Sequence, residues 1–285
     1  MNDKEQNTQT AISEKEFLSS YSIEAFERPS VAADIAVFSM FTEDATSHRK
    51  DSEPKLHILL IQRGEHPFLN SWALPGGFLK SDETIEECAL RELAEEAKLI
   101  PASMMPIGVF SEPKRDPRGR IVSNAFLSVV SEENVAVSGG GDAVNAKWFE
   151  LCFSEGENQL KLSLKNGEEV MNVELAKVRS KLGRVAYEII SSNGLAFDHA
   201  KIIATALNAL RNEAERFIIT FDFLPEKFTL ASLQRVQEIL VGNSLLTANF
   251  RRKTASLVIE TDEYTEGVGH RPARLFIRNA EQFKI

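Results

Sequence analysis

The chain has 285 residues, of which 43% are apolar and 26% are charged, with a formal net charge of −9 at pH 7. These values are ordinary for a globular protein of about two domains, and the negative charge by itself argues against nucleic-acid binding. The sequence has no apolar run near the roughly 20 residues of a membrane-spanning helix and no secretory signal, and its two cysteines lack metal-like spacing, so we expect free thiols and a cytoplasmic location.

The first half of the chain predicts strands around one acidic helix. Residues 1–28 are expected to form a polar tail and a short helix at 13–26, which Pro29 ends. Residues 64–80 are dense in Gly and Pro, and the acidic helix is expected to begin near residue 82. The segments expected to be strands are 31–41, 55–63, 105–113, 121–130 and 145–151.

The apolar period changes in the second half of the chain. Residues 160–170 alternate apolar and polar residues around Asn166 and Gly167, a dipeptide that favours a hairpin turn. Residues 202–210 have helical spacing instead. The elements expected after them are a strand at 217–224, a helix at 229–240 that Thr229 caps, a second short helix at 247–257, and a strand, turn and strand at 258–278.

Carboxylates crowd one face of the acidic helix. At about 100° per residue, Glu92, Glu95 and Glu96 fall within about 100° of one another. The other side of the predicted helix, which we expect to be buried, carries Leu90, Leu93, Ala94 and Ala97. Like charges at this spacing destabilise a helix, and a hard divalent cation with oxygen ligands offsets their repulsion. A solvated acidic face is the alternative, and the spacing of the whole segment decides between the two interpretations.

Residues 77–99 resemble the signature of the Nudix hydrolase family, Gly-x5-Glu-x7-Arg-Glu-U-x-Glu-Glu-x-Gly-U, in which U is a bulky aliphatic residue. The matching residues are Gly77, Glu83, Arg91, Glu92, Leu93, Glu95, Glu96 and Leu99. Lys98 departs from the signature, because the family has there the glycine that ends the helix. A left-handed residue at this position costs a non-glycine roughly 1 kcal/mol, so the departure affects stability but removes no ligand.

The resemblance implies a Nudix α/β/α sandwich and an attack of water on a diphosphate joined to a nucleoside, with Mg²⁺ or Mn²⁺ as the cofactor. Carried over by position, the catalytic residues are Glu83, Arg91, Glu92, Glu95 and Glu96. Glu92, Glu95 and Glu96 would hold the metal, and the backbone carbonyl of Gly77 would join them. Metal ions neutralise charge on a diphosphate and activate water. The general base stays open, with Glu112 and Asp116 as candidates.

The basic loop at 114–120 is suited to an anionic ligand. Arg115, Arg118 and Arg120 are expected to meet a diphosphate, and Phe78 is expected to border an adenine ring. The alternatives are a basic surface loop and an aromatic residue of the core.

The tail of the chain differs in charge from the body. Residues 200–285 carry 12 Lys and Arg against 10 Asp and Glu, while the remainder carries 21 against 32. The expected helices and hairpin have the outline of a winged helix-turn-helix, in which the second helix enters the major groove and the wing holds phosphates. The expected DNA-binding residues are Asn249, Arg251, Arg252, Lys253, His270, Arg271 and Arg274. A solvated helix with an edge hairpin used for dimerisation is the alternative.

Motifs along nearly the whole chain, residues 17–280, are similar to those of the Nudix-related transcriptional regulators of NAD metabolism. The motifs are FERPSVAADIAVFSM, SWALPGGFL, RDPRGRIVSNAF, LAFDHAKIIATAL, FTLASLQRVQEIL, NFRRK and GVGHRPARLF. The resemblance implies a bacterial protein with a Nudix domain at 29–175, a connecting helical segment at 176–215 and a winged helix-turn-helix at 216–285. It also implies ADP-ribose or a related nucleotide as the ligand and double-stranded operator DNA as the partner, with a homodimer expected.

Two hypotheses therefore remain. In the first, the chain is a ligand-responsive DNA-binding regulator, which leaves open whether it also hydrolyses its ligand. In the second, it is a Mg²⁺-dependent Nudix hydrolase of the ADP-ribose pyrophosphatase type, whose C-terminal domain dimerises or positions substrate.

Overall fold

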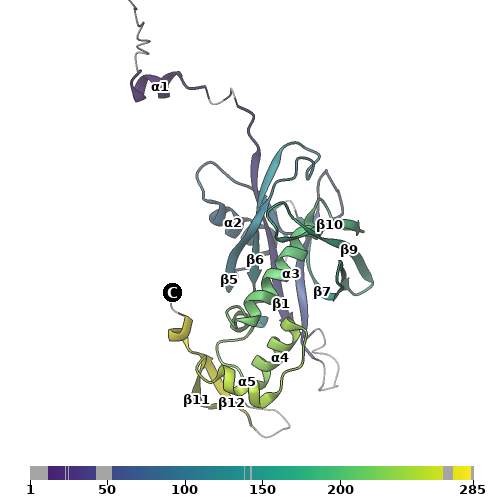
Figure 1. Ribbon diagram of the computed structural model, residues 1–285, viewed down its shortest axis with the longest axis vertical. Helices are drawn as coiled ribbons and strands as arrows, with labels where there is room; N and C mark the ends of the chain where they lie inside the picture. Colours follow the sequence, from purple (N-terminus) through teal and green to yellow (C-terminus); the bar gives the residue numbers. More distant parts are fainter. Residues whose placement is uncertain are drawn as a thin grey trace, which may run out of the picture.

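The computed structural model describes residues 12–22, 24, 26–42, 53–137, 139–141, 143–265 and 272–283. A mixed sheet forms its centre, with the strand order β10-β9-β8-β7-β2-β1-β6-β5, while β3 pairs with β2 and β4 pairs with β1 (Figure 1). Strands β1 and β6 run parallel, and the other pairs are antiparallel. The strands are β1 (Ser30–Phe41), β2 (Lys55–Arg63), β3 (Trp72–Ala73), β4 (Gly76–Phe78), β5 (Ser103–Phe110), β6 (Ile121–Val129), β7 (Ala143–Glu155), β8 (Gln159–Asn166), β9 (Glu169–Arg179) and β10 (Val185–Ser192).

Helices cover both faces of this sheet. Successive side chains of a strand point to opposite faces, so Ile35 and Val37 of β1 pack in the core cluster that contains α2 (Ile85–Ala97). Ala36 and Phe38 pack in the cluster that contains α3 (His199–Glu215). This arrangement confirms the expected α/β/α sandwich. Among the described residues, no helix is both long and apolar enough to cross a membrane.

Most of the expected elements are present, with shifted ends. The short N-terminal helix is α1 (Glu14–Ser20), and Asn166 pairs with Glu169 across the expected hairpin turn. The acidic helix α2 begins at Ile85 rather than near residue 82, because the side chain of Thr84 accepts a hydrogen bond from the backbone of Glu87 and caps the helix there.

The strand expected at 217–224 is wrong. This segment contains a 3-10 helix, η3 (Thr220–Phe223), and Phe217 and Phe221 pack with Phe228 in a C-terminal core. A spacing of four residues places both Phe217 and Phe221 toward this core, and the apolar run needs no strand partner to be buried.

The expected connecting segment at 176–215 is only partly helical. Strand β9 continues to Arg179, and β10 pairs with it as an antiparallel edge strand before α3 begins at His199. The expectation of helix is therefore wrong for residues 176–192, which extend the sheet. The domain boundaries given above stay predictions.

The C-terminal part is a winged helix domain. It contains α4 (Leu230–Val241), which Thr229 caps as expected, α5 (Thr247–Thr254), the hairpin strands β11 (Val258–Tyr264) and β12 (Arg274–Arg278), and η4 (Ala280–Phe283). Figure 1 shows α3 running along the sheet toward α4. The side-chain amide of Gln237 in α4 donates to the carbonyl of Ala214 in α3 over 2.7 Å, so α3 belongs to the packing of both domains.

Candidate functional site

Arg91 gathers three carboxylates at the surface of α2. Its guanidinium lies 2.6 Å from Glu83, 2.6 Å from Glu92 and 3.3 Å from Glu95, measured between nitrogen and oxygen. The same guanidinium donates to the backbone carbonyl of Phe78 over 3.1 Å. Arg91 thus binds both the signature helix and the glycine turn that precedes it.

Glu96 faces the glycine turn rather than Arg91. Its side chain is buried, and one carboxylate oxygen accepts a hydrogen bond from the backbone N–H of Gly76 over 2.9 Å. Next to it, a Cβ atom on Gly77 would lie 2.2 Å from an oxygen of Glu92. A side chain at position 77 would therefore displace the carboxylate of Glu92 from its present position.

The buried face of α2 differs from the predicted one. Leu90 and Ala94 are exposed, whereas Cys88, Ala89 and Glu96 are buried. The prediction for Leu90 and Ala94 is wrong because the sheet contacts a stripe of the helix that is rotated toward the signature carboxylates. Glu96 lies in this stripe, where the Gly76 N–H supplies the hydrogen bond that a buried carboxylate needs.

Lys98 adopts the left-handed conformation expected of the family glycine, with φ 59° and ψ 32°. Its side-chain amine donates to the carbonyl of Glu95 over 3.0 Å. A carbonyl in the last turn of a helix has no intrahelical partner, and a cation there interacts favourably with the helix dipole. The lysine side chain therefore offsets part of the backbone cost that its Cβ introduces.

The charges of the Arg91 cluster are fixed by their contacts. Hydrogen bonds from Arg91 and from the backbone of Lys80 lower the pKa of Glu83 to about 2. The carboxylates of Glu83 and Glu92 in turn raise the pKa of Arg91 above its ordinary value. Burial raises the pKa of the Cys88 thiol to about 12, so this cysteine stays protonated at neutral pH.

The donor set suits a hard divalent cation, but its members are held apart. Among the described residues, no three His, Cys, Asp or Glu side chains converge closely enough to hold a metal ion. Arg91 binds Glu92 and Glu95, while Glu96 binds Gly76. Carboxylate and carbonyl oxygens are nevertheless the ligands that Mg²⁺ prefers. Each ion pair with Arg91 uses one carboxylate oxygen of Glu92 or Glu95. Metal binding by these residues stays a prediction.

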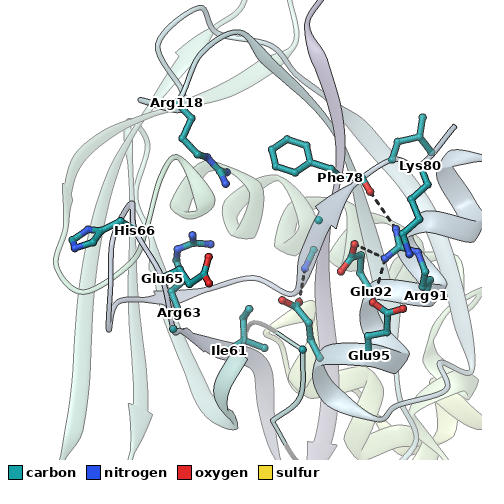
Figure 2. Close-up of a pocket in the computed structure, with 16 residues that line it drawn as sticks. Ile61, Arg63, Glu65, His66, Phe78, Lys80, Arg91, Glu92, Glu95 and Arg118 are labelled. Carbon is teal, nitrogen blue, oxygen red and sulfur yellow. Dashed lines mark hydrogen bonds and ion pairs between the residues drawn. The ribbon is translucent and has the colours of Figure 1, made fainter.

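A cavity of about 440 Å³ lies against the carboxylates; we refer to it as the cleft. Figure 2 shows Arg63, His66 and Arg118 on the side of the cleft opposite Glu92 and Glu95. The ring of Phe78, 42% exposed, borders the cleft and lies 5.1 Å from the guanidinium carbon of Arg118. The side with Arg63, His66 and Arg118, which also carries Glu65, is the basic wall, and the facing side carries Lys80 and Arg91 beside the carboxylates. Guanidinium groups and an exposed aromatic ring suit a phosphorylated ligand with a planar base.

The arginines of the basic loop have different positions. Arg118 reaches the cleft, while Asp116 binds it through both carboxylate oxygens. Arg120 donates to the carbonyl of Ser111 and does not line the cleft. Glu112, a candidate general base, forms an ion pair with Lys201. Of the three arginines expected to meet a ligand, the structure brings only Arg118 to the wall of the cleft.

Arg115 is buried in a network of charges that the sequence analysis missed. Its guanidinium lies 3.0 Å from the carboxylate of Asp34 in β1 and 2.7 Å from that of Asp198, which precedes α3. Burial alone would lower the pKa of Arg115, but these two carboxylates raise it. Ser123 also donates to Asp34 over 2.5 Å. We expected Arg115 to contact a diphosphate, whereas Nε and Nη2 of its guanidinium donate to protein carboxylates.

Two residues at the start of α3 belong to the same network. Asp198 occupies the N-cap position, but its side chain makes no capping hydrogen bond because it binds Arg115. His199 is buried, and its Nδ1 accepts a hydrogen bond from the backbone N–H of Leu74 over 2.9 Å. Burial lowers the pKa of His199 below its ordinary value, although Asp34 and Asp198 act in the opposite direction. A sequence signal for this network was an aspartate inside the apolar strand β1.

The predicted DNA-binding residues cluster on α5. Phe250 and Thr254 bury one side of this helix, and the side chains on its other side are exposed, namely those of Asn249, Arg251, Arg252 and Lys253. Within the described part of the chain, no carboxylate forms an ion pair with the three basic residues.

The predicted DNA-binding residues of the wing differ from those of α5. Arg274 of β12 forms an ion pair with Glu260 and a hydrogen bond with the hydroxyl of Tyr264, both on β11. This arginine is therefore held within the hairpin. His270 and Arg271, also expected to bind DNA, lie outside the described residues.

Two family profiles match this chain, in different parts. Residues 46–152 match the NUDIX domain, and residues 220–277 match the NrtR DNA-binding winged helix domain. The first match contains the glycine turn and α2, and the second contains α4, α5 and the hairpin.

Curated relatives resemble the chain over different lengths. The ADPR responsive transcriptional repressor NtrR of Acinetobacter baylyi is 27% identical over 267 residues, which cover 93% of this chain and 88% of the repressor. The ADP-ribose pyrophosphatase of Methanocaldococcus jannaschii is 40% identical over 119 residues, which cover 41% of this chain and 69% of the enzyme. The similarity to the repressor thus includes both domains.

Solved structures share the two-domain arrangement. A MutT/nudix family protein from Enterococcus faecalis has a TM-score of 0.67 and 26% identity, with 94% of both chains covered. NrtR from Shewanella oneidensis, complexed with a 27mer DNA, has a TM-score of 0.59 and 26% identity, with 88% of this chain and 94% of that chain covered.

Proposed function

We propose a function from one premise, that this chain belongs to the Nudix family and carries a C-terminal winged helix domain of the NrtR type. The protein is a ligand-responsive transcriptional regulator that binds operator DNA. Its Nudix domain binds ADP-ribose or a related nucleoside diphosphate derivative in the cleft. Ligand binding changes the affinity of the winged helix domain for DNA.

One observation carries this proposal: a single helix, α3, joins the two candidate sites. The N-terminus of α3 is bonded through Asp198 to Arg115 and through His199 to the backbone of Leu74, two residues before the glycine turn of the cleft. Its C-terminal end packs against α4. A ligand that favours one position of α3 therefore changes the position of the DNA-binding helices, which is the requirement for coupling between two sites.

The cleft favours a diphosphate with a nucleoside. Arg118 supplies a guanidinium for phosphate oxygens, and Phe78 offers an aromatic face to a base. We infer that Glu92, Glu95 and Glu96 hold Mg²⁺ or Mn²⁺ together with the Gly77 carbonyl, while Glu83 and Arg91 orient them. When bound, the cation would neutralise charge on the diphosphate. In this proposal Arg120 and Arg115 do not contact the ligand, and Arg115 belongs to the buried network.

The exposed face of α5 is the proposed contact with DNA. Asn249 is available for a base edge, and Arg251, Arg252 and Lys253 are available for phosphates. We infer a homodimer acting in the bacterial cytoplasm, since symmetric dimers read two half-sites of an operator.

An electrophoretic mobility shift with DNA from the upstream region of the protein's own gene tests this proposal. We expect a sequence-selective shift that ADP-ribose alters. The double variant Arg251→Ala with Arg252→Ala weakens binding at least about tenfold, since two phosphate or base contacts are lost. The matched control removes two exposed lysines of β8, Lys161 and Lys165, and retains the affinity. A wild-type protein without any selective shift at low salt contradicts the proposal.

Hydrolysis of the ligand is the second candidate function, favoured by the three signature glutamates that line the cleft, Glu92, Glu95 and Glu96. The reaction adds water across the diphosphate of ADP-ribose and yields AMP and ribose 5-phosphate. With Mg²⁺ present we expect AMP to form, and Glu96→Gln to abolish its formation. Binding of ADP-ribose without release of AMP assigns the cleft to sensing alone.

A further inference from the structure

Phe197 lies behind the basic wall of the cleft, at the point where the chain enters α3. The guanidinium carbon of Arg63 lies 5.0 Å from the centre of its ring, and that of Arg118 lies 5.6 Å from it. Both arginines line the cleft, whereas Phe197 does not. The ring is therefore a support for two cations that face the ligand.

The backbone of Phe197 is held in an unusual conformation. Its φ is 52°, in the left-handed region that bulky residues rarely adopt. The surroundings fix this conformation, because the N–H of Ala196 donates to the carbonyl of Trp72 over 2.8 Å and the ring of Phe68 lies 4.7 Å from that of Phe197. Residues in such conformations persist where neighbouring contacts over-determine them, and they concentrate at ligand sites and switches.

The residues after Phe197 connect it to both domains. Asp198 binds Arg115, and His199 accepts from the N–H of Leu74, two residues before the glycine turn of the cleft. The ring of His199 lies 5.3 Å from that of Phe197. Since α3 starts at His199 and contacts α4 at its other end, a displacement of Phe197 acts on an element that reaches the winged helix domain.

We propose that Phe197 is a positioning residue that sets Arg63 and Arg118 for an anionic group of the ligand and transmits ligand binding to α3. The proposal rests on the proposed function. A diphosphate in the cleft attracts both guanidinium groups, and their contact with the ring changes when they move toward the phosphates. A contact that differs between the free and the bound state contributes to the coupling between the two sites.

Substitutions of Phe197 in the full-length protein test this role. We measure the affinity for ADP-ribose by calorimetry, and the ratio of DNA affinities with and without ADP-ribose. Phe197→Leu removes the ring face, and we expect ADP-ribose to bind about threefold to tenfold more weakly and the ratio to move toward one. Phe197→Tyr keeps the ring, so we expect the ADP-ribose affinity and the ratio of DNA affinities to equal those of the wild type.

Two further variants separate this role from general loosening of the fold. Phe197→Asn removes the ring but tolerates the left-handed backbone, so it reproduces the effect of Phe197→Leu. Phe41→Leu is the control, because Phe41 is a half-buried aromatic residue whose ring stacks on that of His57 at 3.9 Å, away from the cleft and from α3. A variant that only loosens the fold lowers the melting temperature and leaves the ratio unchanged.

The possible results are distinguishable. If the wild type binds neither ADP-ribose nor DNA, the proposed function fails, and this inference fails with it. If ADP-ribose changes the DNA affinity of the wild type, and changes that of Phe197→Leu and Phe197→Asn by the same factor, this inference alone is overturned. A loss of response in both variants, with Phe197→Tyr and Phe41→Leu like the wild type, supports it.

Discussion

Two arginines organise carboxylates in the Nudix domain, and their surroundings differ. Arg91 binds Glu83, Glu92 and Glu95 at the edge of the cleft, where the side chain of Glu95 is 52% exposed. Arg115 binds Asp34 and Asp198 inside the protein, where its own side chain is only 4% exposed. Similar ion pairs therefore serve different purposes. Carboxylates beside solvent can exchange an arginine for a cation, whereas buried carboxylates keep their partner because water cannot replace it.

The largest expected effect comes from Arg115→Ala. Removing the arginine leaves Asp34 and Asp198 buried without their cation, so we expect a loss of about 3–5 kcal/mol in the free energy of unfolding. Urea denaturation measures this loss. The control Arg184→Ala, at an exposed turn position, changes stability by less than about 0.5 kcal/mol. A loss below about 1 kcal/mol for Arg115→Ala would remove the distinction between the two arginines.

The matching change in the cleft, Arg91→Gln, has a smaller effect. Solvent reaches this cluster, so we expect a loss of about 1–2 kcal/mol in the free energy of unfolding. Freed carboxylates repel one another, and millimolar Mg²⁺ then raises the melting temperature of the variant more than that of the wild type. Thermal denaturation with Mg²⁺ and with EDTA measures both quantities. An equal response to Mg²⁺ in the two proteins contradicts the proposed metal ligands.

The buried network also predicts a dependence on pH. The pKa of His199 is lowered in the folded protein, so the unfolded chain binds the proton more readily. Stability is therefore retained above about pH 6.5, the ordinary pKa of histidine, and falls as the pH decreases below it. His199→Gln keeps an acceptor for the Leu74 N–H and loses this part of the dependence. Urea denaturation at pH values above and below the ordinary pKa of histidine checks it, and parallel curves for the two proteins count against a neutral, buried His199.

The smallest effect on stability is expected at the C-terminal end of α2. Lys98→Gly removes the cost of a Cβ in the left-handed region but also the hydrogen bond to Glu95, so stability changes by less than about 0.5 kcal/mol. Lys98→Ala keeps the cost of a Cβ in the left-handed region and loses the hydrogen bond. We therefore expect it to be less stable than both the wild type and Lys98→Gly. If Lys98→Ala equals the wild type in thermal denaturation, the lysine side chain contributes nothing.

The two arginines also show why some predictions from the sequence were right and others were wrong. The Arg91 cluster lies within one short segment, residues 83–95, so helical spacing was enough to place its members together. The strand expected at 217–224 was wrong because an apolar run alone does not distinguish a strand from a short buried helix. Arg115 was expected at the ligand because its loop is basic, and no local pattern indicated that Asp34 and Asp198 would enclose it.

The sequence by itself determined the signature helix, the glycine turn and the order of the two domains. These features depend on residues a few positions apart, whose relative placement the helix and turn geometry fixes. Only the tertiary structure decided that Asp34, Arg115 and His199 form one network and that Phe197 supports both Arg63 and Arg118. These residues come from separate strands and loops, and they meet because β1 lies at the centre of the sheet and α3 packs across it.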